Sequence, residues 1–187
     1  LSDTAILTQN VTLSGTSQLS DYVNSSPLSV FKAGRLAVID GSGMEANIAV
    51  MDIKVAETLR FHPELLDALG FKFARPGGLD DQELARALKV EKVLVAGARY
   101  ESAKEDLTSA LLPVWGKHVV FAVVPPSAAV MQQSLGYMVR LEGSSPRKVY
   151  KEANFNPPGS TKILVEDEYD MLISNVGCGY LIKNAIA

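Results

Sequence analysis

The chain has 187 residues, of which 47% are hydrophobic and 21% are charged, and its net charge is −3. This length predicts one domain with a substantial core, and the composition is too apolar for a disordered chain. The acidic balance argues against tight nucleic-acid binding, which needs a basic face. The single cysteine, Cys178, excludes an intrachain disulfide and a cysteine-based zinc site.

No apolar run approaches the roughly 18 residues that cross a membrane, so no membrane partner is expected. The first residues also lack the basic start and apolar block of a signal peptide. Because the chain begins with Leu1 in place of Met, we expect a fragment or a processed chain.

Residues 1–25 are polar and rich in Ser and Thr. The segments 12–15 and 18–22 are candidates for short strands. A stretch this polar buries little, so we expect an exposed, extended excursion that becomes ordered only against a partner.

Helices and short strands then alternate. Ser26 and Pro27 predict a helix start, and 41–43 predicts its end. The other helix signals are Asp52 as a cap, His62 with Pro63 as a second start, Gly70 as a stop, and the Asp80/Glu83 capping box of a helix that ends near Lys89. The expected strands lie at 48–51 and 93–96.

The stretch 111–124 holds the only tryptophan, Trp115, and is followed by two prolines. It predicts a buried, central strand at 119–124 with Trp115 as a packing anchor. From Gly136 the pattern is β only, with strands around 137–141, 149–150, 163–165, 171–173 and 180–182, and turns at 143–146 and 156–159. Helices in the first half and strands in the second favour an α+β fold.

Candidate catalytic residues are few. We interpret His62 as a helix cap, and His118 stands at a strand start without carboxylates at metal-ligand spacing. Cys178 lies between two glycines and is expected to be packed, not reactive. No serine stands in a nucleophile elbow. The sequence therefore predicts no catalytic, cofactor-binding or metal-binding residue, no cofactor and no enzyme activity.

Two further patterns have structural interpretations. The segment 41–43, Gly-Ser-Gly, lacks the remaining residues of a phosphate loop and of a dinucleotide fingerprint. The acids at 166–168 with Asp170 lack the glycine and the alternation of a calcium loop, so we expect a solvated turn. Their mutual repulsion would ease if a basic neighbouring subunit docked there.

Several pieces in this order resemble the major capsid proteins of tailed phages and prophages, which share the capsid fold named after the Hong Kong phage. Each piece is weak alone, and the resemblance rests on their order and spacing. The pieces are 13–27, 46–51, the helix that ends at His62-Pro63, 83–100, 114–120, 134–137 and 179–183.

The resemblance implies an axial lobe, a peripheral lobe with a spine helix and long strands, and an extended N-terminal loop. Residues 1–25 would form the extended loop. Residues 26–46 and 136–174 would form the peripheral lobe, and 47–135 with 175–187 the axial lobe.

The function implied is a structural subunit that self-assembles into an icosahedral shell around double-stranded DNA. Its partners would be copies of itself in pentamers and hexamers, with scaffold, portal or decoration proteins as further candidates and DNA bound only weakly. The chain would assemble in the bacterial cytoplasm and reside in the virion capsid.

Two alternatives stay open. A bacterial nanocompartment shell protein, as in encapsulins, would share the fold and enclose protein cargo. A small hydrolase or binding module of another fold would need two of His62, His118 and Cys178 in one pocket.

Overall fold

The computed structural model describes residues 3–70, 77–103, 108–127, 129, 132–140, 147–155 and 159–187, without the side chains of 154 and 155. It is a mixture of helices and strands, which confirms the α+β class. The chain divides into two compact units: unit 1 comprises Leu1–Leu135 with Asn175–Ala187, and unit 2 comprises Gly136–Ser174. The turn expected at 143–146, and that at 156–159 apart from Gly159, lie outside the described residues.

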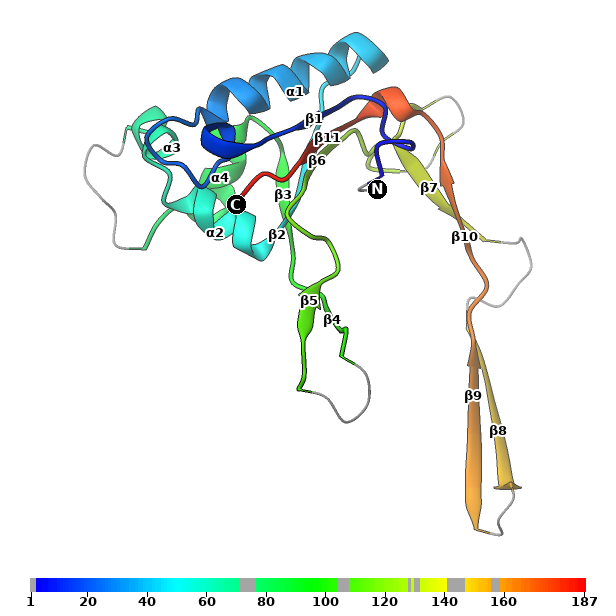
Figure 1. Ribbon diagram of the computed structural model, residues 1–187. Coiled ribbons are helices and arrows are strands. Elements are labelled where there is room, and N and C mark those ends of the chain that lie inside the picture. Colours follow the sequence, from blue (N-terminus) through cyan, green and yellow to red (C-terminus); the bar gives the residue numbers. More distant parts are fainter. Residues whose placement is uncertain are drawn as a thin grey trace. The chain divides into compact units, whose positions relative to one another are not determined.

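Unit 1 is built on a five-stranded sheet in the order β1-β11-β6-β2-β3. Its strands are β1 (Asn10–Thr12), β2 (Ile48–Asp52), β3 (Lys92–Ala96), β6 (Val119–Ala122) and β11 (Gly179–Lys183). The pairs β1–β11 and β2–β3 are parallel, and β6 runs antiparallel to both of its neighbours. Strand β6 is the middle strand of the sheet (Figure 1). All four of its side chains are buried, so the expected central strand is confirmed.

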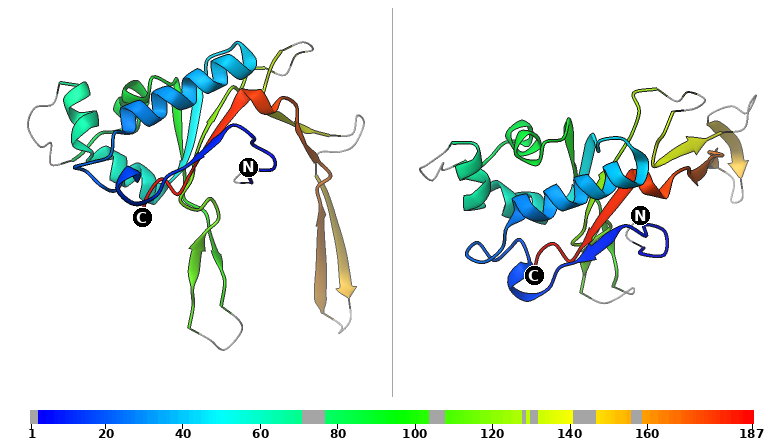
Figure 2. Two further views of the ribbon diagram at one scale, coloured as in Figure 1. Left: turned by 45° about the horizontal axis from the view of Figure 1, so that its top comes forward. Right: turned by 90° about the horizontal axis from the view of Figure 1, so that it is seen from above.

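Helix α1 (Pro27–Ser42) lies against β11 and β6 (Figures 1 and 2). Phe31 packs edge-on against Phe121 with ring centroids 5.6 Å apart. Gly34 lies directly above Tyr180, and Gly43 ends the helix in a left-handed conformation with φ of 72°. Ser26 takes the N-cap position, but its hydroxyl donates to Glu64 instead of capping the helix.

Three short helices gather near the N-terminal end of α1 (Figure 1): α2 (Ile53–Arg60), α3 (Pro63–Ala68) and α4 (Asp81–Leu88). Asp52 caps α2 by accepting from the Lys54 amide, and His62 caps α3 by accepting from the Glu64 amide. Asp80 and Glu83 form the expected capping box of α4. The predicted caps of these three helices are therefore confirmed, whereas the side-chain cap expected from Ser26 on α1 is not formed.

The N-terminal segment differs from its expected form. Leu7, Leu13 and Leu19 are buried in the core, and β1 adds an edge strand beside β11. The short 3-10 helix η1 (Gly15–Ser17) follows β1. The prediction of an exposed excursion that buries little is thus wrong for the described part of 1–25, because three spaced leucines reach the core between polar residues.

Two smaller elements complete unit 1. Strands β4 (Arg99–Glu101) and β5 (Leu111–Pro113) form a two-stranded arm that extends from the sheet (Figure 1). The 3-10 helix η2 (Val176–Cys178) leads into β11 and contacts α1. Trp115 is half-buried against the core, and its indole N–H donates to the His118 carbonyl at 3.1 Å.

Unit 2 consists of two antiparallel ladders. One pairs β7 (Gly136–Val139) with β10 (Asp170–Ile173), and the other pairs β8 (Lys148–Phe155) with β9 (Ser160–Glu166). The sequence analysis grouped 26–46 with 136–174. The structure groups α1 with unit 1 instead, because α1 buries its apolar side against β6 and β11.

Candidate functional site

His62 is a structural residue at the start of α3. Its ring is buried, and Tyr22 packs edge-on against it with ring centroids 5.2 Å apart. Nδ1 accepts the Glu64 amide at 3.2 Å, so the proton of the neutral ring is on Nε2. Nε2 lies 3.1 Å from the Ser25 hydroxyl, to which it therefore donates.

This proton arrangement excludes a serine nucleophile at His62. The Ser25 hydroxyl donates its own proton to the Asp21 carbonyl, so the histidine cannot remove it as a base. Burial lowers the pKa of His62, against an opposing effect from Glu64, and keeps the ring neutral. The hydrogen bonds of His62 to Ser25 and to the Glu64 amide join the end of the N-terminal segment to α3.

His118 and Cys178 lie at opposite ends of the β6–β11 ladder. The Asn184 amide, just after β11, donates to His118 Nδ1 at 3.4 Å, whereas Cys178 directly precedes β11. Five strand residues separate the two ends, which corresponds to about 16 Å. His62 is on a different element, at the N-cap of α3, and its ring contacts Tyr22 and Ser25.

Neither residue has the environment of a reactive group. Burial, and then the charge of Lys183, lower the pKa of His118. Burial raises the pKa of the Cys178 thiol, which lies 3.8 Å from the Gln133 side-chain oxygen and stays protonated. Neither of the two pockets found among the described residues is lined by His62, His118 or Cys178, so the structure gives no support for a hydrolase site there.

Of the acids at 166–170, Asp167 lies beside two arginines. Asp167 lies 3.7 Å from Arg140 and 3.5 Å from Arg147. Within the residues that the structure describes, no group of His, Cys, Asp or Glu side chains could hold a metal ion. Glu168 and Asp170 remain exposed in this turn.

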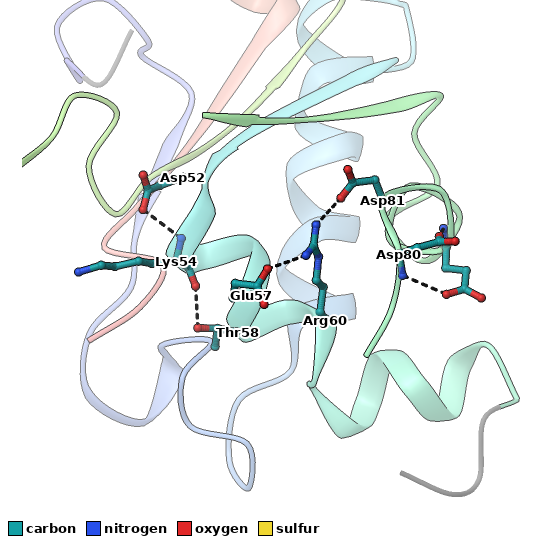
Figure 3. A network of polar contacts seen from close by, with 8 residues as sticks. Asp52, Lys54, Glu57, Thr58, Arg60, Asp80 and Asp81 are labelled. Atoms are coloured by element: carbon teal, nitrogen blue, oxygen red, sulfur yellow. Dashed lines mark hydrogen bonds and ion pairs between the residues drawn. The ribbon is translucent and has the colours of Figure 1, made fainter. Parts of the chain in front are cut away.

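A polar network that the sequence analysis did not predict joins α2 to α4 (Figure 3). Arg60, at the end of α2, contacts Glu57 at 2.5 Å and Asp81 at 2.6 Å. Asp52 is buried and lies 3.5 Å from the Arg99 guanidinium, which links the start of α2 to β4. Arg60–Asp81 and Asp52–Arg99 join residues far apart in sequence, so no local pattern predicts them, and their role is to position helices.

The β4–β5 arm has an apolar surface that its own unit leaves uncovered. Leu111 is 64% exposed, and Tyr100, Leu112 and Val114 are exposed beside it. Glu101 joins the two sides of the arm at its loop end by accepting from the Ala103 and Ala110 amides and the Ser109 hydroxyl. The Ser109 bond, followed by these amides, lowers the pKa of Glu101, so the arm is held closed at neutral pH.

The β8–β9 ladder exposes large apolar side chains on both faces, between pairs that carry charged residues. Val149 pairs with Val165 and Lys151 with Ile163 on one face, and Tyr150 pairs with Leu164 on the other. Ile163 is 63% exposed and Val149 62%. A two-stranded ladder is marginally stable by itself, and exposed apolar strands with free edges favour pairing with another chain.

Comparison with known proteins gives a consistent result. Over 176 residues, 94% of this chain and 55% of the relative, the chain is 26% identical to the major capsid protein of Pseudomonas phage JBD67. It is 28% identical over 125 residues to the major capsid protein of Burkholderia phage BcepMu, which covers 64% of this chain and 39% of the relative. The resemblance to phage major capsid proteins is confirmed.

A solved structure agrees with these relatives. A phage-related protein from Bordetella bronchiseptica RB50 superposes with a TM-score of 0.81 at 26% identity, covering 98% of this chain and 59% of that protein. No protein-family model matches the chain. The chain thus spans between two fifths and three fifths of the length of these similar proteins.

A search of the described residues found no helix long and apolar enough to span a bilayer. The two arms, β4–β5 and β8–β9, expose large apolar side chains. The sequence predicted strands at 149–150 and 163–165, within β8 and β9, but none at β4 or β5, and it did not identify either arm as a surface. The available signal was the apolar residues at adjacent positions of 163–165, where a half-buried strand would alternate.

Proposed function

We propose that this chain is the shell-forming part of a phage-type major capsid protein. The similarity to a phage major capsid protein along 94% of the chain carries the proposal. In this proposal, copies of the chain form pentamers and hexamers that assemble into a closed icosahedral shell around double-stranded DNA. The shell forms in the bacterial cytoplasm and becomes part of the virion, where scaffold, portal and decoration proteins are further partners.

The exposed arms support self-association. The β4–β5 and β8–β9 ladders both present large apolar side chains to solvent, and water disfavours such surfaces by about 25 cal/mol per Å². In a shell, neighbouring copies would cover them through repeated contacts closed by symmetry.

We assign unit 2 to the peripheral lobe and the five-stranded sheet of unit 1 to the axial lobe, with α1 as the candidate spine helix. The mild net charge of −3 suits a container wall that does not hold the genome tightly. No structural role in this proposal requires catalysis or a cofactor.

The test is expression of the full-length protein that carries this chain, followed by analytical sedimentation and nucleic-acid absorbance of the particles. The proposal predicts large particles of uniform size that protect DNA from nuclease in an infected or induced host. Uniform particles that carry a defined enzyme and no DNA would instead identify a nanocompartment shell. A folded protein that stays monomeric under all assembly conditions would contradict both.

A further inference from the structure

A basic groove lies between α1, the end of α3 and the end of α4. Its volume is about 260 Å³. The buried side chains of Phe31 and Leu88 line it, together with the half-buried Leu28 and Leu69. These apolar side chains favour an occupant that brings apolar atoms of its own.

Four cations surround this apolar lining: Lys32 and Arg35 from α1, and Arg86 and Lys89 from the end of α4. No carboxylate is among the lining residues, and none of the four has an ion pair among the described residues. The buried Nε of Arg35 also has no hydrogen-bond partner there. An unpaired buried donor costs free energy that a polar partner would recover.

Helix position accounts for only part of this cluster. Arg86 stands in the last turn of α4 and Lys89 is its C-cap, where cations interact favourably with the helix dipole. Lys32 and Arg35 stand in the middle of α1, where the helix dipole does not favour cations, and yet they line the same groove as two further cations. The groove therefore concentrates positive charge that the described chain does not neutralise.

The chain carries a segment of matching chemistry in unit 2. In 168–171, the acids Glu168 and Asp170 alternate with Tyr169 and Met171, and all four are exposed. Asp167 is already paired with Arg140 and Arg147, but neither Glu168 nor Asp170 has an ion pair among the described residues. Carboxylates and apolar side chains thus alternate on an exposed segment.

We infer that the basic groove receives the segment 168–171 of a second copy of this chain. The inference rests on the proposed function, because it names one contact through which copies would associate. The carboxylates of Glu168 and Asp170 pair with the cations of the groove, while Tyr169, which precedes β10, covers its apolar lining. A nucleic acid fits less well, because four cations around an apolar lining lack the extended basic face that phosphates need.

Zero-length carbodiimide cross-linking tests the contact directly, since it joins a lysine amine to a carboxylate in contact with it. The experiment mixes unlabelled and nitrogen-15-labelled full-length protein and identifies the linked peptides by mass spectrometry. We expect mixed-isotope links from Lys32 or Lys89 to Glu168 or Asp170. The inference would be overturned if these residues were linked only within single molecules. It would also be overturned if these residues formed no links.

Charge reversal gives a second readout. Lys32→Glu with Arg86→Glu should raise the concentration needed for assembly about tenfold, equivalent to about 1.4 kcal/mol per contact. Glu168→Lys with Asp170→Lys should have a similar effect, and all four changes in one chain should restore assembly. Lys54→Glu with Lys92→Glu is the matched control on exposed lysines outside the groove.

The possible outcomes separate the two proposals. If the wild type forms shells but the groove reversal is tolerated or the fourfold variant is not rescued, the groove contact is wrong and the capsid function stands. If the reversal leaves assembly unchanged and instead weakens binding of fluorescent double-stranded DNA, the groove is a nucleic-acid site and the inference fails. If no copies associate, both proposals fail.

Discussion

Burial keeps both histidines neutral in the folded protein. The pKa of His62 is lowered from about 6.5 by desolvation, and that of His118 is lowered by desolvation and Lys183. The unfolded chain therefore binds more protons than the folded chain just below pH 6.5, so stability rises with pH there. The stabilising contribution of the neutral histidines is complete above the pKa of histidine in the unfolded chain. It is lost progressively as the pH falls below that pKa.

A His62→Asn variant tests this linkage at one residue. Asparagine is a good N-cap, so the Glu64 amide keeps an acceptor while the titrating group is removed. Between pH 7.5 and 5.5, urea denaturation should show a smaller loss of unfolding free energy in the variant than in the wild type. The matched His118→Asn variant should keep the contribution of His62 to the pH dependence of the unfolding free energy. If the unfolding free energy of the wild type and of His62→Asn changed equally with pH, the linkage would be contradicted.

Gly34 fixes how closely α1 approaches the sheet. A Cβ at this position would lie 2.8 Å from the Tyr180 ring and 3.5 Å from the Phe121 ring. Alanine favours helix formation by about 1 kcal/mol, but overpacking a tight contact costs about 1–3 kcal/mol. The tight contact should therefore decide the sign.

We expect Gly34→Ala to lower the free energy of unfolding by up to about 2 kcal/mol net. Chemical denaturation measures the change, and Ala33→Gly at an exposed position of α1 measures the propensity effect alone. A Gly34→Ala protein more stable than the wild type would show that the helix can move away from Tyr180 without cost.

Among the elements, the β8–β9 ladder exposes several large apolar side chains to solvent. Its central pairs are apolar on both faces, and cross-strand pairing alone gives little stability. This surface is expected if copies of the chain cover it, and unfavourable for an isolated monomer.

Ile163→Glu should block assembly without disrupting the ladder. The new carboxylate faces Lys151 across the strands, so the pair remains favourable in the free chain, but burying a charge at a contact is costly. Light scattering should show at least about a tenfold rise in the concentration needed for assembly. Thr161→Glu, opposite Ala153, is the control expected to assemble nearly normally, and normal assembly of Ile163→Glu would exclude this face from the contacts.

Local signals explain which elements the sequence could predict. The caps at Asp52, His62 and Asp80 and the stop at Gly43 follow from hydrogen bonds between neighbouring residues, and the structure has them all. The central strand β6 follows from its continuous apolar run. These interactions need only a few consecutive residues.

Burial of the N-terminal segment depends on distant partners. Thr12 pairs with Lys183, and the Leu19 amide donates to the Ala185 carbonyl, so the segment is held by the other end of the chain. The only local sign is the six-residue spacing of Leu7, Leu13 and Leu19, which matches neither helix nor strand periodicity. The basic groove was equally hidden, because its cations come from two separate helices.

For the whole molecule, the contacts predict that unit 1 folds without unit 2. Its buried core comes from unit 1 alone, and Gly136 pairs with Ile173, so Leu135 and Asn175 flank two residues that lie side by side. A chain in which a short Gly-Ser linker replaces 136–174 should therefore keep a cooperative thermal transition close to that of the wild type. The same deletion should abolish shell formation, and a loss of folding would show that the units form one cooperative structure.

Electron cryomicroscopy of the full-length protein after assembly tests the central claim most directly. The account predicts closed shells of uniform diameter whose wall accommodates α1, the five-stranded sheet and unit 2, with the apolar arms covered by neighbouring copies. A correctly folded protein that yields only monomers or irregular aggregates under all assembly conditions would contradict it.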